Sequence, residues 1–431
     1  MKNMKTKILS NQEPKGTRDW LPEEFAIRHY IFETWRKVCR QYGFEEYLTP
    51  LVEYAEVYRA KSGEDIGGKE LVTFTDLGGR ELCIRPEITP SVTRMVSKIY
   101  TATPKPLKYF SIANFMRNEK PQRGRNREFW QLNCDIFGSD SPSADLEVLQ
   151  LSLDIMAAFG APAGSFKMFL NSRQLLDGLL ALCGNLDHEQ KIAIVRTLDK
   201  WEKLSKNDLA KKLEESNLSK EIIKNIFSFM ESKTIADLEK NLPELADNSG
   251  LLEIKKTIAD LNQLGYDNVY FNPAVIRGFD YYDGLVFEVF DTHPDNNRAM
   301  FGGGRYNGLA ELFGSASFPA VGFAPGDEMI RLFLESWDLL KDKKIKSEEI
   351  FYLPLLDESL LVQARKLAKK LRSEGKEVLL GFETQKINKA LEFANKKGIS
   401  RVVIFGSEEE KNKEYKIKNM QDGREEIFTL S

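Results

Sequence analysis

The sequence predicts an α+β protein: an antiparallel sheet with flanking helices and a helical insertion, followed by a separate α/β domain. Three observations predict this fold. Short strand-like runs fill the first part of the chain without a βαβ alternation. Long charged helical patterns follow over residues 175–264, and strands alternate with helices after residue 348. A chain of 431 residues is also too long for one compact core.

The first predicted element is an amphipathic helix over residues 22–42, closed by Gly43. Its apolar positions recur at helical spacing and are Phe25, Ile31, Phe32, Trp35 and Val38. A strand follows over residues 44–50 and stops at Pro50. Further strands are predicted at residues 72–76, 81–85, 107–115, 129–137 and 285–290.

Changes in composition predict the domain boundaries. The first part of the sheet domain is expected at residues 1–174, the helical insertion at 175–264 and the second part of the sheet domain at 265–335. Residues 336–347 are rich in lysine and aspartate and predict a linker, and residues 348–431 predict the α/β domain. Its strands and helices are expected at 350–356, 360–373, 377–381, 385–397 and 401–405, with a hairpin at Asp422-Gly423.

Composition excludes several classes of protein. The four cysteines lie far apart without CxxC spacing, so neither a zinc site nor a disulfide framework is indicated, and a reducing cytoplasm fits best. The three histidines form no metal-binding pair. No apolar run is long enough to span a membrane, and the first residues do not resemble a secretory signal. A net charge of −3 argues against general coating of nucleic acid, but it allows tRNA binding through local basic patches.

Residues 277–288 carry the most informative motif, Arg-Gly-Phe-Asp-Tyr-Tyr-Asp-Gly-Leu-Val-Phe-Glu. Arg277 keeps its charge and offers five donors in a rigid fork, which suits a carboxylate or a phosphate. Tyrosine beside aspartate suits a small polar ligand that needs a hydrogen-bond partner and an aromatic wall. Taken alone, the run is equally consistent with a surface turn that leads into a core strand.

This motif resembles the signature of histidyl-tRNA synthetases, and further segments resemble motifs of the same family in the family's order. They are Pro-Lys-Gly-Thr-Arg-Asp at 14–19, Ile-Arg-Pro-Glu-Ile-Thr-Pro at 84–90, Phe-Met-Arg-Asn-Glu at 115–119 and Phe-Gly-Gly-Gly-Arg-Tyr-Asn-Gly at 301–308. The helix and strand before Pro50 resemble motif 1 of class II aminoacyl-tRNA synthetases, which forms the dimer interface in that class. The resemblance spans almost the whole chain. It implies a class II catalytic sheet and, at residues 348–431, an anticodon-binding domain.

The resemblance also implies a role for each matched residue. Arg117 and Arg277 would be the catalytic cations on the two sides of the ATP α-phosphate. The histidine-binding residues would be Glu87, Thr89, Gln131, Asp135, Arg277, Tyr281, Tyr282 and Tyr306. The ATP-binding residues would be Arg117, Glu119, Arg125 and Arg277, and Lys120, Gln122 and Arg123 would approach the tRNA acceptor end. No metal site built from side chains is implied.

Two positions depart from the family's pattern. Asp135 stands where members often carry glutamate, so its acid group is one carbon shorter. Met329 stands where the family's motif 3 has an arginine that contacts the adenine and the γ-phosphate. A helix that begins near Gly326 would direct its positive end at phosphate, although Asp327 would oppose that potential. The sequence leaves open whether Arg331 substitutes for the arginine.

Together these matches imply a cytoplasmic, homodimeric histidine–tRNA ligase. Such an enzyme activates L-histidine with ATP to histidyl-adenylate and diphosphate, and then transfers histidine to the 3′ end of tRNA(His). Mg²⁺ would bind the β- and γ-phosphates. The alternative is the family's histidine-binding regulatory paralogue of the ATP phosphoribosyltransferase type, which the altered motif 3 favours and the domain at 348–431 opposes. A purely tRNA-binding module would not need Glu87, Arg117 and Arg277 together.

Overall fold

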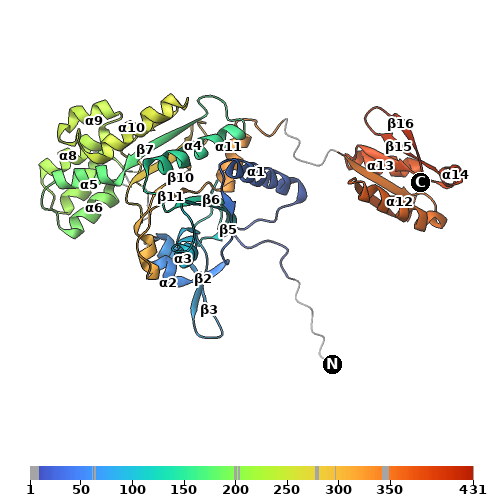
Figure 1. Cartoon of the computed structure of the whole chain (residues 1–431), viewed down its shortest axis with the longest axis horizontal. Coiled ribbons are helices and arrows are strands. Elements are labelled where there is room, and N and C mark those ends of the chain that lie inside the picture. Colours follow the sequence, from blue (N-terminus) through green and yellow to red (C-terminus); the bar gives the residue numbers. More distant parts are fainter. Residues whose placement is uncertain are drawn as a thin grey trace. The chain divides into compact units, whose positions relative to one another are not determined.

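The computed structural model describes residues 9–60, 62, 65–198, 201, 204–276, 281–296, 298–341 and 349–430. The chain divides into two compact units, Met1–Lys341 and Asp342–Ser431 (Figure 1). The linker expected at residues 336–347 lies across this division.

Among the described residues of the first unit, eight strands form the main sheet in the order β1-β5-β6-β11-β10-β9-β7-β8. Neighbouring strands from β5 to β7 are antiparallel, and the outer pairs β1–β5 and β7–β8 are parallel. The strands are β1 (Glu45–Glu46), β5 (Leu107–Met116), β6 (Glu128–Phe137), β7 (Phe166–Ser172), β8 (Val269–Phe271), β9 (Leu285–Asp291), β10 (Ala299–Arg305) and β11 (Ala320–Phe323). This sheet and its helices confirm the predicted α+β class.

The two faces of the sheet differ because side chains alternate along each strand. On β6, Leu132, Cys134 and Ile136 belong to the main hydrophobic core. Three helices pack against β6, namely α1 (Pro22–Gln41), α4 (Pro142–Ala158) and α11 (Asp327–Ser336) (Figure 1). Helix α1 also packs against both α4 and α11. The other face is left for the cavity described below.

The predicted first helix is confirmed as α1, and four of its five expected core positions are buried. Phe25 in the first turn is exposed instead, so the predicted stripe begins one turn too early. The strand predicted over residues 44–50 is much shorter than expected. Its pairing with β5 covers Glu45–Glu46, and residues 47–50 form no regular secondary structure.

A group of helices interrupts the main sheet between β7 and β8 and gathers at one end of the unit (Figure 1). The helices are α5 (Arg173–Leu182), α6 (His188–Leu198), α7 (Lys206–Glu215), α8 (Lys220–Glu231), α9 (Ile235–Asn241) and α10 (Ser249–Gln263). The side chains of Ser205, Ser219, Thr234 and Asn248 accept hydrogen bonds from backbone N–H groups in the first turns of α7 to α10. Such caps explain why these charged segments begin as helices where they do.

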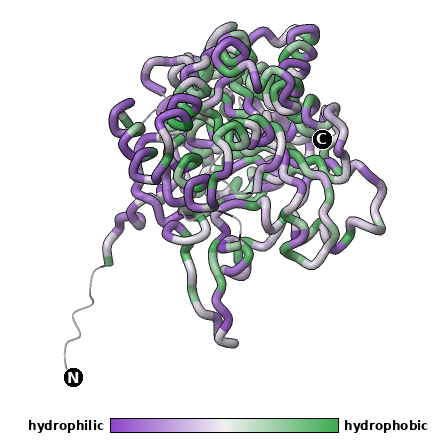
Figure 2. The backbone as a smooth tube through the Cα atoms, turned by 90° about the vertical axis from the view of Figure 1, so that its left-hand side faces the viewer, coloured by the Kyte–Doolittle hydropathy of each residue, from purple (hydrophilic) through white to green (hydrophobic). Residues whose placement is uncertain are grey.

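A smaller sheet in the same unit contains β2 (Val52–Tyr54), β4 (Glu81–Ile84) and β3 (Val72–Thr75). The sequence predicted the last two strands but not their separation from the main sheet. The β3–β4 hairpin projects from the unit and carries apolar residues along its strands (Figures 1 and 2). Helix α2 (Ala55–Arg59), the π-helical turn η1 (Asp65–Lys69) and helix α3 (Thr89–Ile99) connect this sheet to the rest of the unit.

The second unit is a sheet covered by helices, in the order β13-β12-β14-β15-β16. Its elements are β12 (Ile350–Leu355), α12 (Leu361–Ser373), β13 (Glu377–Thr384), α13 (Ile387–Lys396), β14 (Arg401–Ile404), α14 (Ser407–Asn412), β15 (Glu414–Asn419) and β16 (Glu425–Thr429). The parallel pairs β12–β13 and β12–β14 confirm the predicted strand–helix alternation. The predicted terminal hairpin is also confirmed, as β15–β16, with Gly423 at a positive φ of 74° in its turn.

Candidate active site

A cavity of about 790 Å³ opens on the face of the main sheet opposite α1. Glycines on this sheet leave room for neighbouring protein groups: a Cβ added to Gly322 would lie 2.1 Å from Asp135 Oδ1, and one added to Gly304 would lie 2.5 Å from the Leu285 carbonyl oxygen. Gly322 therefore lets the Asp135 carboxylate lie over β11 at the cavity, and Gly302 of β10 lines the cavity without a side chain.

Strand β6 lines one wall of the cavity with alternate residues, namely Phe129, Gln131, Asn133 and Asp135. Gln131 donates its amide to the Ala324 carbonyl oxygen at 3.2 Å. The Tyr306 hydroxyl donates to Asp135 Oδ1. Burial raises the pKa of Asp135 to about 7, and the nearby charge of Glu87 adds to the shift.

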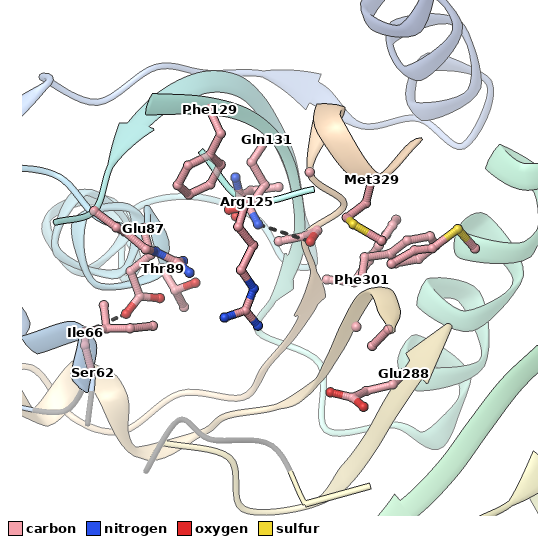
Figure 3. A pocket seen from close by; sticks show the side chains of 18 of the residues that line it. Ser62, Ile66, Glu87, Thr89, Arg125, Phe129, Gln131, Glu288, Phe301 and Met329 are labelled. Atoms are coloured by element: carbon pink, nitrogen blue, oxygen red, sulfur yellow. Dashed lines mark hydrogen bonds between the residues drawn. The ribbon is translucent and has the colours of Figure 1, made fainter. Parts of the chain in front are cut away.

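Glu87 forms an acidic corner of the cavity and is almost fully buried (Figure 3). The hydroxyls of Ser62 and Tyr281 donate to its two carboxylate oxygens, the second at 3.0 Å. Burial raises the pKa of Glu87, while these hydrogen bonds and the charge of Arg117 oppose the rise. A buried carboxylate held in this way is suited to a cation, such as an ammonium group.

Arg117 lies beside this corner at the end of β5. Its Nε donates to the Pro86 carbonyl oxygen at 3.0 Å, and its guanidinium carbon lies 5.1 Å from the centre of the Phe129 ring. Burial lowers the pKa of Arg117, and the charges of Glu87 and Glu119 oppose this effect. The side chain is therefore held in one direction by a backbone oxygen and an aromatic face, with donors left for a ligand.

The loop between β5 and β6 carries a further cation that lines this cavity, Arg125. Its guanidinium lies 3.5 Å from Glu119 and extends into the open part of the cavity (Figure 3). A tight turn closes the loop, because Gln122 and Arg125 exchange backbone hydrogen bonds. The base of the loop is fixed from the N-terminal segment, where the Gly16 carbonyl oxygen accepts from the Arg127 N–H at 2.8 Å.

Motif 3 begins helix α11, as expected, with Gly326 as N-cap. The charge of Asp327 is paired within the protein: its carboxylate lies 2.6 Å from the Arg28 guanidinium and accepts the Trp130 N–H at 3.0 Å. Arg331 does not replace the missing arginine in this structure, because it pairs with Glu328 and Glu335 on its own helix.

Met329 lines the cavity on the opposite side from Glu87 (Figure 3). A Cβ added to Gly124 in the β5–β6 loop would lie 2.5 Å from Met329 Sδ. The thioether therefore packs directly against the loop, where the family pattern has an arginine.

The structure brings most of the predicted substrate-binding residues into this one cavity. Lining it are Glu87, Thr89, Arg117, Glu119, Arg125, Gln131, Asp135, Tyr281, Tyr282 and Tyr306. Lys120, Gln122 and Arg123 are exposed on the β5–β6 loop and do not line the cavity within the described part of the chain. Arg277, predicted to contact both substrates, lies outside the described residues.

The sequence assigned no role to several residues that line the cavity. Ser62 and Arg173 come from separate elements, so only the fold brings them there, whereas Glu288 is the last residue of the 277–288 motif. Asn133 had a detectable signal, because it lies between Gln131 and Asp135 in the alternation of a strand that was predicted correctly. Across the described residues, no cluster of three histidine, cysteine or acidic side chains is arranged to hold a metal ion.

Comparisons with known proteins agree with this geometry. A model of the histidyl-tRNA synthetase family matches residues 16–329, and a model of an anticodon binding domain matches residues 345–431. The chain is 38% identical over 429 residues to a histidine–tRNA ligase of Leptospira biflexa serovar Patoc, and this alignment covers 99% of this chain and 97% of that protein. It is 35% identical over 428 residues to a histidine–tRNA ligase of Pyrococcus horikoshii, and this alignment covers 97% of this chain and 96% of that protein.

Among solved structures, a histidyl-tRNA synthetase from Nostoc sp. PCC 7120 has a similar fold, with a TM-score of 0.77 over 98% of this chain and 97% of that one, at 22% identity. Fold and cavity thus define a class II aminoacyl-tRNA synthetase, as the sequence predicted. Because the family match covers well over half of the chain and the relatives extend over nearly all of it, the chain belongs to the histidyl-tRNA synthetase family.

Proposed function

We propose that this protein activates L-histidine with ATP and transfers it to tRNA(His). Its family and its near-full-length relatives make it a histidine–tRNA ligase, an aminoacyl-tRNA synthetase with ATP as substrate. One observation carries the residue-level proposal. A buried carboxylate (Glu87), a fixed cation (Arg117) and a polar wall (Gln131 and Asp135) face one cavity.

Each part of this cavity suits one part of the amino acid. Glu87, with Thr89 beside it, would bind the α-ammonium group, because the buried carboxylate already accepts hydroxyl donors on both oxygens and needs a cation to balance it. Gln131 and Asp135 would face the carboxylate and the imidazole ring. Tyr281, Tyr282 and Tyr306 would form the aromatic wall, since their rings pack at centroid distances of 4.9 to 6.4 Å.

Activation requires attack of the histidine carboxylate on the ATP α-phosphate. The protein needs to form no covalent intermediate, so its contribution is positioning and charge stabilisation. Arg117 would bridge the carboxylate and the α-phosphate, and Arg277 would act from the other side. Glu119 would accept from the adenine amino group, and Arg125 would reach the γ-phosphate from the loop.

Mg²⁺ is proposed to arrive with ATP, bound to its β- and γ-phosphates. The described side chains offer no three-residue cluster for a metal ion, so the chain itself would contribute charge balance and not a metal cage. Diphosphate would leave with that ion.

The second unit is proposed to bind the anticodon, since a model of an anticodon binding domain matches residues 345–431. Lys120, Gln122 and Arg123 are exposed on the loop at the cavity, where they would meet the acceptor end. The regulatory paralogue considered above would need neither feature. No helix in the described part of the chain is long and apolar enough to cross a membrane, and we propose a cytoplasmic location.

A homodimer is proposed, with the helix and strand before Pro50 at its interface as the resemblance implies, and the small sheet that follows them offers a further surface for it. Val52, Tyr54 and Phe74 are exposed on one face of β2 and β3, and Leu82 and Ile84 of β4 share that face by register. An apolar strand face of this kind is suited to a second copy of the chain. Phe74→Glu should lower the mass measured by light scattering toward one subunit, while Thr75→Glu on the opposite face should leave the mass unchanged.

The test of the proposed activity is pyrophosphate exchange driven by each amino acid in turn. Histidine alone should support exchange. Glu87→Gln should raise the KM for histidine at least tenfold with a small effect on the KM for ATP, whereas Glu81→Gln, at an exposed carboxylate, should change neither. Exchange that does not depend on histidine would contradict the proposed activity.

A further inference from the structure

Two neighbouring polar side chains on β6 are buried at the cavity without a partner for one atom each. Asn133 is 3% exposed and Asp135 is 4% exposed. Asn133 Nδ2 and Asp135 Oδ2 have no hydrogen-bond partner among the described residues. Buried polar atoms in native proteins nearly always have a partner, so these two atoms point to a ligand that supplies both contacts.

The two atoms belong to one wall of the cavity. Residues two apart on a strand present their side chains on the same face, roughly 7 Å apart along the strand. Gly322 on β11 is paired with Asp135, and its lack of a side chain lets the Asp135 carboxylate lie over that strand, since an added Cβ would be 2.1 Å from Oδ1. A planar group in the cavity can therefore lie against both side chains.

The chemistry of the two atoms selects the ligand group. Asp135 Oδ1 is occupied by the Tyr306 hydroxyl, which leaves Oδ2 as an acceptor. Asn133 Nδ2 is a donor. A group that donates to one neighbour and accepts from the other is needed, and the neutral imidazole ring carries one N–H and one bare nitrogen.

We propose that Asn133 is a further histidine-binding residue, which donates to one ring nitrogen while Asp135 accepts from the other. This inference rests on the proposed function and extends it. The amide and the acid would distinguish imidazole from rings of similar size, because an apolar ring leaves both buried atoms unpaired and a ring with only an oxygen acceptor leaves Asp135 Oδ2 unpaired. Ring specificity would then depend on a residue that the family resemblance does not assign.

Asn133→Ala should raise the KM for histidine about tenfold to a hundredfold in pyrophosphate exchange and leave the KM for ATP within twofold. Asn133→Ser, which keeps a shorter hydrogen-bond donor, should have a KM for histidine between those of the wild type and Asn133→Ala. Ser111→Ala is the matched control. Ser111 is paired with Asn133 across β5 and β6, is fully buried and has an unpartnered Oγ among the described residues, but it does not line the cavity there.

Histidines methylated on one or the other ring nitrogen give a second measurement. The wild type should use both analogues poorly. In Asn133→Ala, the KM for one analogue should come closer to the KM for histidine. This should be the analogue whose methyl group faces the removed amide, and the other analogue should not change in this way.

A KM for histidine within twofold of wild type in Asn133→Ala would overturn the inference. An equal rise in the KM for histidine in Ser111→Ala would also overturn the inference, and so would an equal improvement in the use of both methylated analogues by Asn133→Ala. Each result would indicate a general change in strand packing. An unchanged KM for ATP shows that a variant is folded. A wild type without histidine-dependent exchange would overturn the proposed function itself, whereas an active wild type with a silent Asn133→Ala overturns only this inference.

Discussion

The buried ion pair between Arg28 and Asp327 is expected to be a major determinant of stability in the catalytic unit. Arg28 on α1 and Asp327 at the start of α11 are 5% and 3% exposed at their side chains, and their nearest atoms are 2.6 Å apart. The Trp20 ring covers the Arg28 guanidinium at 3.7 Å. Asp327 also accepts the Trp130 N–H of β6, so the pair joins the motif 1 helix, a central strand of the sheet and the start of motif 3.

The magnitude follows from the distance and the burial. At 2.6 Å and an effective dielectric constant of about 20, the attraction is roughly 6 kcal/mol, and much of it offsets the loss of hydration. Arg28→Met leaves the Asp327 carboxylate buried without its cation, which should cost about 3–5 kcal/mol. The double variant Arg28→Met/Asp327→Leu should recover most of this loss, because no charge then remains buried.

The cost of Arg28→Met should depend on pH. Burial raises the pKa of Asp327 to about 6, above its ordinary value of 3.8, even with Arg28 present. The native state therefore holds a proton between about pH 4 and 6 that the unfolded chain has released, and the contribution of Asp327 to stability falls as the pH rises through this window. Loss of Arg28 raises that pKa further, so the variant should lose less stability at pH 5 than at pH 8.

The assay is urea denaturation followed by tryptophan fluorescence. All five tryptophans precede residue 342, so the signal reports on the first unit alone. Arg59→Met is the matched control: its partner Glu81 is also 2.6 Å away, but both side chains are 48% exposed, and the loss of stability should be much smaller because water screens the pair. Equal losses of unfolding free energy in Arg28→Met and Arg59→Met would refute the argument. Strictly additive losses in Arg28→Met/Asp327→Leu would also refute it.

Three further outcomes are expected. Arg277→Ala should lower the turnover of histidyl-adenylate formation far more than it raises the KM for ATP, measured by pyrophosphate exchange; a raised KM with normal turnover would mean a binding role only. Deletion of residues 350–431 should leave exchange measurable and cripple aminoacylation of tRNA, and full charging by the truncated chain would contradict anticodon binding. Arg125→Ala should raise the KM for ATP, while Met329→Arg should lower it modestly or not at all; a silent Arg125→Ala would exclude that residue from the γ-phosphate.

Much of the site could be predicted from the sequence because its residues come from continuous motifs. On β6, Gln131 and Asp135 were expected to share a face, since the strand was predicted correctly and strand alternation has a fixed period. Glu87 and Tyr281 were expected at one ligand, and the structure joins them by a hydrogen bond of 3.0 Å. Family resemblance supplied these roles, and periodicity supplied only their geometry.

The remaining contacts could not be predicted, because they join segments that no local pattern connects. Nothing near Arg28 in the sequence indicates that its partner is Asp327, almost 300 residues later. The separation of β2, β3 and β4 into a sheet of their own also depends on pairing partners and not on the strand patterns themselves.

The structure shows how the altered motif 3 is accommodated. Met329 stands where the family pattern has a cation, and Asp327 lies two residues earlier on the first turn of α11. Arg28 neutralises that carboxylate from the side of the sheet opposite the cavity, so the N–H groups at the start of α11 do not face an unpaired negative charge. The thioether meanwhile fills the space under Gly124, where an added Cβ would lie 2.5 Å from sulfur. An arginine introduced at position 329 would have to displace this loop before it could reach a phosphate, which is why restoring the charge alone is expected to gain little.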